Sequence, residues 1–118
     1  MITVAFLTND LRSIDAHFGS AEYLAVYGID TNEVKLIKVA KFNDERTEGR
    51  IETLKKSGVD IVYCVEIGPA AAAKVVNNHI FPIKYKEAVN MASELVKLQN
   101  MLSTNPPPFI KKIQSQRA

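Results

Sequence analysis

The 118-residue sequence predicts a single α/β domain in which helices flank a five-stranded mixed sheet. Three apolar runs typical of β-strands come first, and no helical pattern separates them. The rest of the chain alternates helical patterns with short apolar runs, as parallel β-α-β units do. The expected element order is therefore β-β-β-α-β-α-β-α, and a chain of this length fits one domain.

Three strands are expected in the first part of the chain. The first, Ile2–Leu7, is an apolar run followed by turn residues, as in a buried central strand. Tyr23–Ile29 and Val34–Phe42 flank a polar turn and form a predicted hairpin. Three lysines punctuate the last of these strands, which is typical of a sheet edge. Residues 9–20 are expected to form a loop with at most one short turn.

The second half of the chain contains three predicted helices and two predicted strands. Each helix is indicated by capping residues or an apolar face, and each strand by a short apolar run between turn residues. The expected elements are, in order, a helix that begins after Asn43-Asp44 and ends at Gly58, the strand Asp60–Val65, a helix from Gly68-Pro69 to Asn77-Asn78, the strand Ile80–Ile83 and the helix Glu87–Leu102.

Two regions differ in composition. We expect residues 1–105 to form the domain and residues 106–118 to form a proline-rich, basic C-terminal tail with one docked turn that then frays. Residues 1–83 carry 9 basic and 11 acidic side chains, whereas residues 84–118 carry 6 and 2. This basic excess is too sparse for a protein that binds duplex nucleic acid.

The composition also indicates the compartment. No apolar run approaches the roughly 18 residues that a membrane span needs, so we expect no membrane partner. Cys64 is the only cysteine, which excludes an intramolecular disulfide. The sequence therefore predicts a cytoplasmic protein in a reducing compartment.

The topology predicts where a ligand would bind. In the commonest arrangement of these elements, the strand 60–65 lies parallel to the first strand and beside it, and this order resembles the ribonuclease-H-like fold. The carboxyl ends of parallel strands open on one edge of the sheet, which is the usual ligand site of α/β proteins. At this edge we expect His17, Cys64 and the helix start at Gly68-Pro69.

These groups suit an anionic metal cluster. A helix N-terminus presents unpaired N–H groups and about half a positive charge. Imidazole and thiolate are ligand types found at iron–sulfur clusters. Other roles remain open: Cys64 as a small buried hydrophobe, Gly68-Pro69 as a simple helix start, Asp10, Asp15 and Glu66 as solvated charges, and Arg12 as a solvated charge or as the partner of a bound anion.

Two catalytic interpretations lack necessary parts. A ribonuclease-H-type nuclease needs several carboxylates around two metal ions, and the first strand contributes none. The cluster would have to come from Asp10, from Glu48 or Glu52, and from Glu66. A cysteine hydrolase would pair Cys64 with His17 or His79, but no third group that orients the histidine is identifiable. The sequence therefore favours neither of these two catalytic functions.

Three segments of the chain resemble a known protein family. They are HFGSAEYLAVYGID (17–30), IVYCVEIGPAAAAKVVNNHIFPIKY (61–85) and LQNMLSTNPPPFIKKI (98–113). Over nearly its whole length the chain resembles the dinitrogenase iron–molybdenum cofactor-binding proteins, which include the NifX group, the NafY core domain and the C-terminal part of NifB. The proline-rich ending looks closer to the NifX group.

The resemblance implies a non-enzymatic carrier with a ribonuclease-H-like fold that lacks the nuclease carboxylates. We expect it to be a monomer. Such proteins transiently bind iron–sulfur precursors of the nitrogenase cofactor, made by NifB, and pass them to a NifEN-type scaffold. Relatives bind the finished cofactor, so apo-dinitrogenase is a further candidate partner. The alternative is a regulatory or protein-interaction module of the same superfamily that binds no cluster.

The resemblance also implies the site residues. The histidine of the HFG motif is the family's candidate metal ligand, and here that residue is His17. Cys64 is not carried over from the family and is a second-rank candidate metal ligand, on its position at the end of the strand 60–65 alone. Where the family has Gly-Gly-Pro before the alanines, this chain has Gly68-Pro69-Ala70, so one glycine is missing. The predicted cofactor-binding set is Arg12, His17, Phe18, Gly19, Ser20, Gly68 and Pro69.

Overall fold

The computed structural model describes residues 1–104 and 106–117. Its elements, in chain order, are β1 (Ile2–Thr8), β2 (Ser13–Ile14), β3 (Tyr23–Ile29), β4 (Val34–Lys41), α1 (Thr47–Lys56), β5 (Ile61–Cys64), α2 (Pro69–Asn77), β6 (Phe81–Lys84), β7 (Val89–Asn90), α3 (Met91–Ser103) and α4 (Pro108–Arg117). Each helix and strand expected from the sequence is present. Three further elements, β2, β7 and α4, are absent from the prediction.

A five-stranded mixed sheet forms the centre of the molecule, in the strand order β4-β3-β1-β5-β6. β3 runs antiparallel to both β1 and β4, whereas β5 is parallel to β1 and β6 is parallel to β5. β5 therefore lies beside β1, and the predicted ribonuclease-H-like order is confirmed. Because β1 and β5 are parallel, their carboxyl ends open at the same edge of the sheet.

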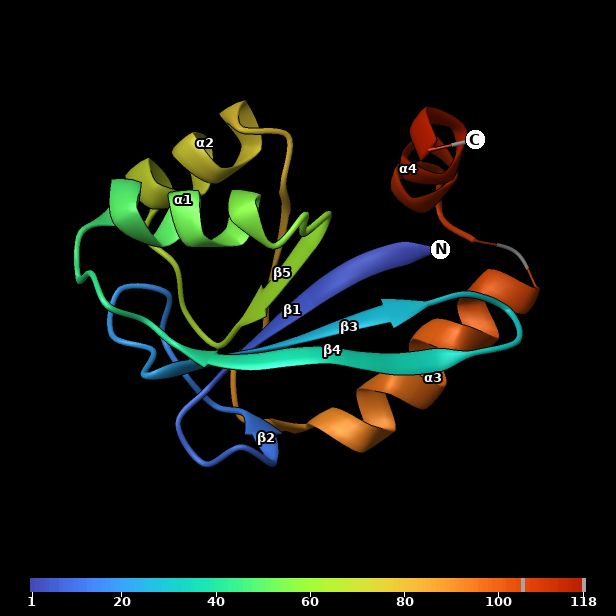
Figure 1. Ribbon diagram of the computed structural model, residues 1–118, viewed down its shortest axis with the longest axis horizontal. Coiled ribbons are helices and arrows are strands. Elements are labelled where there is room, and N and C mark those ends of the chain that lie inside the picture. Colours follow the sequence, from blue (N-terminus) through green and yellow to red (C-terminus); the bar gives the residue numbers. More distant parts are fainter. Residues whose placement is uncertain (105, 118) are drawn as a thin grey trace.

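Helices cover both faces of this sheet. α1 and α2 lie on one side of it and α3 on the other (Figure 1). In β1, Phe6 belongs to the core cluster under α3, and Leu7 to the cluster under α1 and α2. β5 alternates likewise, with Tyr63 on the α3 side and Cys64 on the other. Both strands are buried along their whole length, so they form a rigid base for the loops that follow them.

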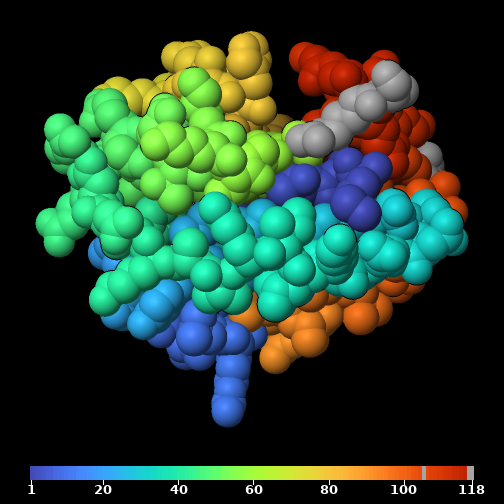
Figure 2. Space-filling model, viewed as in Figure 1, coloured from blue at the N-terminus to red at the C-terminus, as the bar shows by residue number. Residues whose placement is uncertain are grey.

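β4 is an exposed edge strand, and its side chains lie across the face seen in Figure 2. The edge position that its lysines predict is confirmed. Apolar side chains are exposed between the lysines, with Leu36 at 52%. The pairing with β3 also shifts between Val26 and Tyr27. Lysines and a bulge both hinder the addition of another strand to a sheet edge.

The loop between β1 and β3 contains a short strand, because β2 pairs antiparallel with β7. The predicted start of the last helix at Glu87 is therefore wrong. Residues 89–90 are strand, and α3 begins at Met91, where the Asn90 side chain accepts a hydrogen bond from the Ser93 N–H (3.0 Å). Pairing with a distant segment here overrides the local preference for helix.

The proline-rich end of the chain forms the helix α4. Ile110 is fully buried in the core cluster under α3, and the ring of Phe109 stacks on Phe81 of β6 with centroids 4.2 Å apart. The prediction of a single docked turn that frays is therefore wrong, since these contacts anchor a helix. The predicted boundary between 1–105 and 106–118 involves residue 105, outside the described residues. None of the described helices is long and apolar enough to cross a membrane.

Candidate functional site

The loop after β1 returns alongside the carboxyl end of β5. His17 and Glu66 form an isolated parallel bridge there. The Phe18 N–H donates to the Glu66 carbonyl (2.7 Å), and the Val65 N–H donates to the Ala16 carbonyl (2.9 Å). These two hydrogen bonds fix His17 at the sheet edge that the sequence predicts for it.

His17 begins a tight turn. Its carbonyl accepts hydrogen bonds from the N–H groups of Ser20 (3.2 Å) and Ala21 (2.9 Å). Phe18 is only 1% exposed and packs into the core under α1 and α2, whereas His17 is exposed. Ala16, on the other side of His17 in the chain, is buried in the same core. The two buried neighbours hold the backbone of His17 at the surface, where its side chain is exposed.

An open pocket of about 440 Å³ lies beside this turn. Its lining comes from the turn and from the segment between β5 and α2, and consists of His17, Gly19, Ser20, Glu66, Ile67 and Gly68. The prediction that His17 shares a cleft with the start of the alanine-rich helix is confirmed. The cleft brings together four members of the predicted set: His17, Gly19, Ser20 and Gly68.

The N-terminus of α2 opens onto this pocket. Gly68 is its N-cap residue, and no side chain caps the helix. Pro69 occupies the first turn, where its missing N–H is no loss. The first turn of a helix has N–H groups without intrahelical partners, and it carries positive potential. This wall of the pocket therefore favours an anion.

Among the residues that line the pocket, His17 and Glu66 have side chains of types that can bind a metal ion. In the described residues, the imidazole of His17 makes no hydrogen bond or ion pair, so its nitrogens are available to a ligand. Across residues 1–104 and 106–117, no group of three or more His, Cys, Asp or Glu side chains could hold a metal ion. The carboxylates considered for a nuclease therefore do not converge.

Cys64 lies away from the pocket. Its side chain is fully buried in the core under α1 and α2, and its Sγ contacts the Ile83 carbonyl at 3.8 Å. Burial, with a smaller contribution from the Glu66 charge, raises the pKa of the thiol to about 11. A protonated, buried thiol is a poor metal ligand and a poor nucleophile. The structure therefore does not bring Cys64 to His17.

Three other predicted residues do not line the pocket. Phe18 supports it from the core. Pro69 is exposed on α2. Arg12 is exposed next to β2, where its N–H donates to Asp10 (2.8 Å) and its carbonyl accepts from Met91 (3.0 Å). Arg12 is thus bound to the β2–β7 side of the loop.

Two lining residues were missed by reasoning from the sequence. Glu66 was considered only as a solvated charge or a nuclease carboxylate, and Ile67 was not considered. A signal for both existed, because they follow β5 within three residues, at the predicted ligand edge. Glu66 adds a negative charge to the pocket, with two oxygen atoms that can accept hydrogen bonds or coordinate a metal.

Comparison with known proteins supports the assignment of this chain. The family model described as "Dinitrogenase iron-molybdenum cofactor" matches residues 1–101. Protein NifX of Rhodobacter capsulatus is 32% identical over 95% of this chain and 77% of its own length. Protein NifX of Herbaspirillum seropedicae is 34% identical over 92% and 79%.

A solved structure has the same fold. The crystal structure of PH0822 superposes with a TM-score of 0.73 at 19% identity, covering 84% of this chain and 91% of that one. At this identity the likeness shows the fold alone. The family model and the relatives identify the group: the chain belongs to the dinitrogenase iron–molybdenum cofactor family, and within it to the NifX proteins.

Proposed function

We propose that this protein is a cytoplasmic, non-enzymatic carrier that transiently binds an iron–sulfur precursor of the nitrogenase iron–molybdenum cofactor. Family membership supports a role in the handling of this cofactor. The observation that carries the finer proposal is the unpartnered imidazole of His17 in an open pocket at the uncapped start of α2. We propose His17 as the ligand to iron.

The chemistry of the pocket suits a cargo that is held and then released. Sulfide-rich clusters are anionic, and a charge at a helix N-terminus is stabilised by about 0.3–1 kcal/mol. One imidazole holds iron less firmly than the four thiolates of a resident cluster site. Because the pocket is open, a ligand from the receiving protein can reach the cluster and displace His17.

The remaining lining residues have supporting roles in this proposal. Gly19 and Gly68 bring no side chain, so the cluster can approach their backbone closely. Ser20 offers a hydroxyl donor. We do not assign a ligand role to Cys64, because its thiol is buried away from the pocket. Arg12 and Pro69 lie outside the lining. Arg12 can act on an anion only through its charge, and Pro69 only starts the helix α2.

The proposed partners follow from the cargo. A protein of NifB type would supply the cluster, and a NifEN-type scaffold would receive it, with apo-dinitrogenase as a further candidate recipient. The relatives named NifX and NifY support a place in this machinery. We propose that the carrier works as a monomer, since an open pocket on one chain is enough to hold and release the cargo.

An anaerobic titration with the isolated NifB-derived cluster tests the proposal. The wild-type protein should develop visible charge-transfer absorbance, and His17→Ala should bind the cluster about tenfold more weakly or worse. The matched control is His79→Asn, because His79 is exposed at the other end of the parallel strands and has a positive φ that asparagine tolerates. This control should bind like the wild type.

Two results would contradict parts of the proposal. If the wild-type protein develops no absorbance, it is not a carrier, and the interaction module without a cluster becomes the better account. If His17→Ala binds as tightly as His79→Asn, the carrier role survives and His17 is not the ligand.

A further inference from the structure

We infer that Arg50, on the buried side of α1, is a positioning residue for the cluster pocket. It holds the end of the His17–Ala21 turn and places an unpaired positive charge on the core side of that turn. This inference rests on the proposed carrier function for its meaning, but its structural part can be tested without any cluster.

Arg50 is buried in an unusual way for an arginine. The residue is only 4% exposed, whereas an arginine is seldom buried unless its charge is paired. Its Nη1 donates to the Ala21 carbonyl (2.8 Å), and its guanidinium lies 4.5 Å from the centre of the Phe42 ring. Its Nε is buried with no hydrogen-bond partner among the described residues. Such an arrangement is costly and calls for a compensating role.

The hydrogen bond to Ala21 connects α1 with the pocket. The Ala21 N–H donates to the His17 carbonyl (2.9 Å), which closes the turn, while the Ala21 carbonyl accepts from Arg50. Ala21 is 1% exposed, so water cannot replace the arginine as donor. A buried carbonyl left without a donor is strongly unfavourable. Arg50 therefore determines where the turn ends and, through it, where His17 lies.

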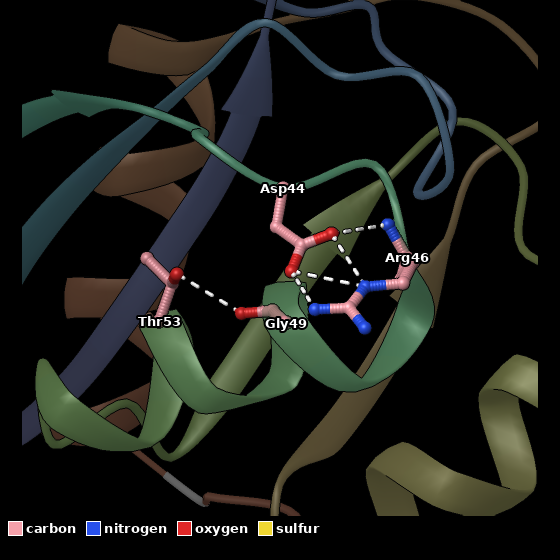
Figure 3. Close-up of polar contacts among 4 residues, drawn as sticks. All are labelled: Asp44, Arg46, Gly49 and Thr53. Carbon is pink, nitrogen blue, oxygen red and sulfur yellow. Dashed lines mark hydrogen bonds and ion pairs between the residues drawn. The ribbon is translucent and has the colours of Figure 1, made fainter.

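Two acidic residues, Glu45 and then Asp44, act on the charge of Arg50, but neither forms an ion pair with it in the described residues. Asp44 is already engaged. Arg46 donates hydrogen bonds to the Asp44 carboxylate from Nη2 (2.8 Å) and Nε (3.1 Å), as Figure 3 shows. This contact lowers the pKa of Asp44 to about 2. In the described residues Arg50 itself makes no ion pair. A buried, unpaired guanidinium near the pocket favours an anionic cargo more strongly than a solvated one would.

Three variants test this inference. Arg50→Met removes the charge and the donor but keeps a long side chain, and Arg50→Lys keeps the charge without the planar fork that bridges Ala21 and Phe42. The matched control is Lys55→Met, which removes an exposed positive charge within the same helix. If Arg50→Met fails to fold, Arg50→Lys carries the test.

The first measurement is amide hydrogen exchange in the cluster-free protein. Arg50→Met should exchange the amides of Ser20 and Ala21 about tenfold faster or more, while the Ser93 amide at the start of α3 should stay near its wild-type rate. Arg50→Lys should lie between Arg50→Met and the wild type. Lys55→Met should leave the Ser20 and Ala21 amides unchanged. Acceleration that is equal at Ser93 and Ala21 would overturn the positioning role, because it would show only a general loss of stability.

The second measurement is affinity for the isolated NifB-derived cluster. We expect a loss of about tenfold in Arg50→Met, a smaller loss in Arg50→Lys and none in Lys55→Met. Unchanged affinity in folded Arg50→Met would overturn the inference. A wild-type protein that binds no cluster would end the carrier proposal, and the exchange data would still decide whether Arg50 holds the turn.

Discussion

The two halves of the loop between β1 and β3, residues 9–15 and 16–22, differ in how far their own polar side chains hold the backbone. In the first half, polar side chains bind the backbone: Asp10 Oδ1 accepts from the N–H groups of Arg12 (2.8 Å) and Ser13 (2.7 Å), and Asp15 Oδ1 accepts from Asn9 (2.7 Å). In the second half, backbone groups bind one another through the His17–Ala21 turn and the bridge to Glu66.

This difference explains which side chains are free for a ligand. The carboxylates of the first half are used to shape the loop, so they are poor candidates for metal ligands. In the second half, backbone hydrogen bonds close the turn and Arg50 of α1 holds its end. The imidazole of His17 is not used for this, so its nitrogens are available. A polar residue in a loop is therefore a candidate ligand only when the loop can fold without it.

The largest expected effect comes from Phe18→Ala, which breaks the second half of the loop. Phe18 is 1% exposed in the core, and removing such a ring costs about 3–5 kcal/mol of the free energy of unfolding. Urea denaturation measures this loss. His17→Ala, one residue away and exposed, should change stability by less than about 0.5 kcal/mol. Equal losses in the two variants would contradict the division of roles between these neighbours.

A smaller effect is expected from Asp10→Ala, which breaks the first half. Hydrogen bonds, first from the Arg12 N–H and then from the Ser13 N–H, lower the pKa of Asp10 below its usual 3.8. A lowered carboxyl pKa stabilises the fold above the unfolded-state pKa, and that stabilisation is lost as pH falls through the folded-state pKa.

Thermal unfolding across pH measures this effect. Asp10→Ala should have a lower Tm than the wild type at pH 7, and the difference should shrink as pH falls below 3.8. Its cluster affinity should change less than that of His17→Ala. A difference in Tm that stays constant down to pH 2 would show that the Asp10 charge is not what holds the loop.

Glu66→Gln removes a negative charge at the pocket and tests whether the second half of the loop faces an anionic cluster there. Glu66 is exposed, and its negative charge opposes an anionic cluster. Removing that charge should therefore raise the affinity by up to about fivefold, which corresponds to about 1 kcal/mol. The titration used for His17→Ala measures it, with Glu48→Gln on α1 as the control. A clear fall in affinity would mean instead that the Glu66 carboxylate binds iron.

The smallest effect is expected from Cys64→Ala. Because the thiol is fully buried and its pKa is raised to about 11, it should take no part in binding. Cluster affinity should stay within about twofold of the wild type. The native protein should also react slowly with iodoacetamide at pH 7 and rapidly after unfolding in urea. Loss of the cluster signal in this variant would restore Cys64 as a ligand.

Local patterns in the sequence were enough to predict the sheet and the sheet edge at which the candidate pocket lies. Apolar periodicity and turn residues depend on neighbours in the chain, so they locate β1, β3, β4, β5 and β6, and the crossover rule then places β5 beside β1. The HFG segment likewise pointed to His17 before any coordinates. Contacts between distant segments carry no such local signal, which is why the pairing of β2 with β7 and the helix α4 escaped prediction.

What the sequence by itself determined was the order of the elements, the family resemblance and the choice of His17. Only the tertiary structure decided which side chains join it. Cys64 and Glu66 are two residues apart, yet the helices α1 and α2 cover the first while the end of β5 leaves the second exposed. Arg50 gives no hint of burial in an amphipathic helix, and its contact with Ala21 spans 29 positions. Burial depends on what packs against a residue, and that is a property of the folded chain.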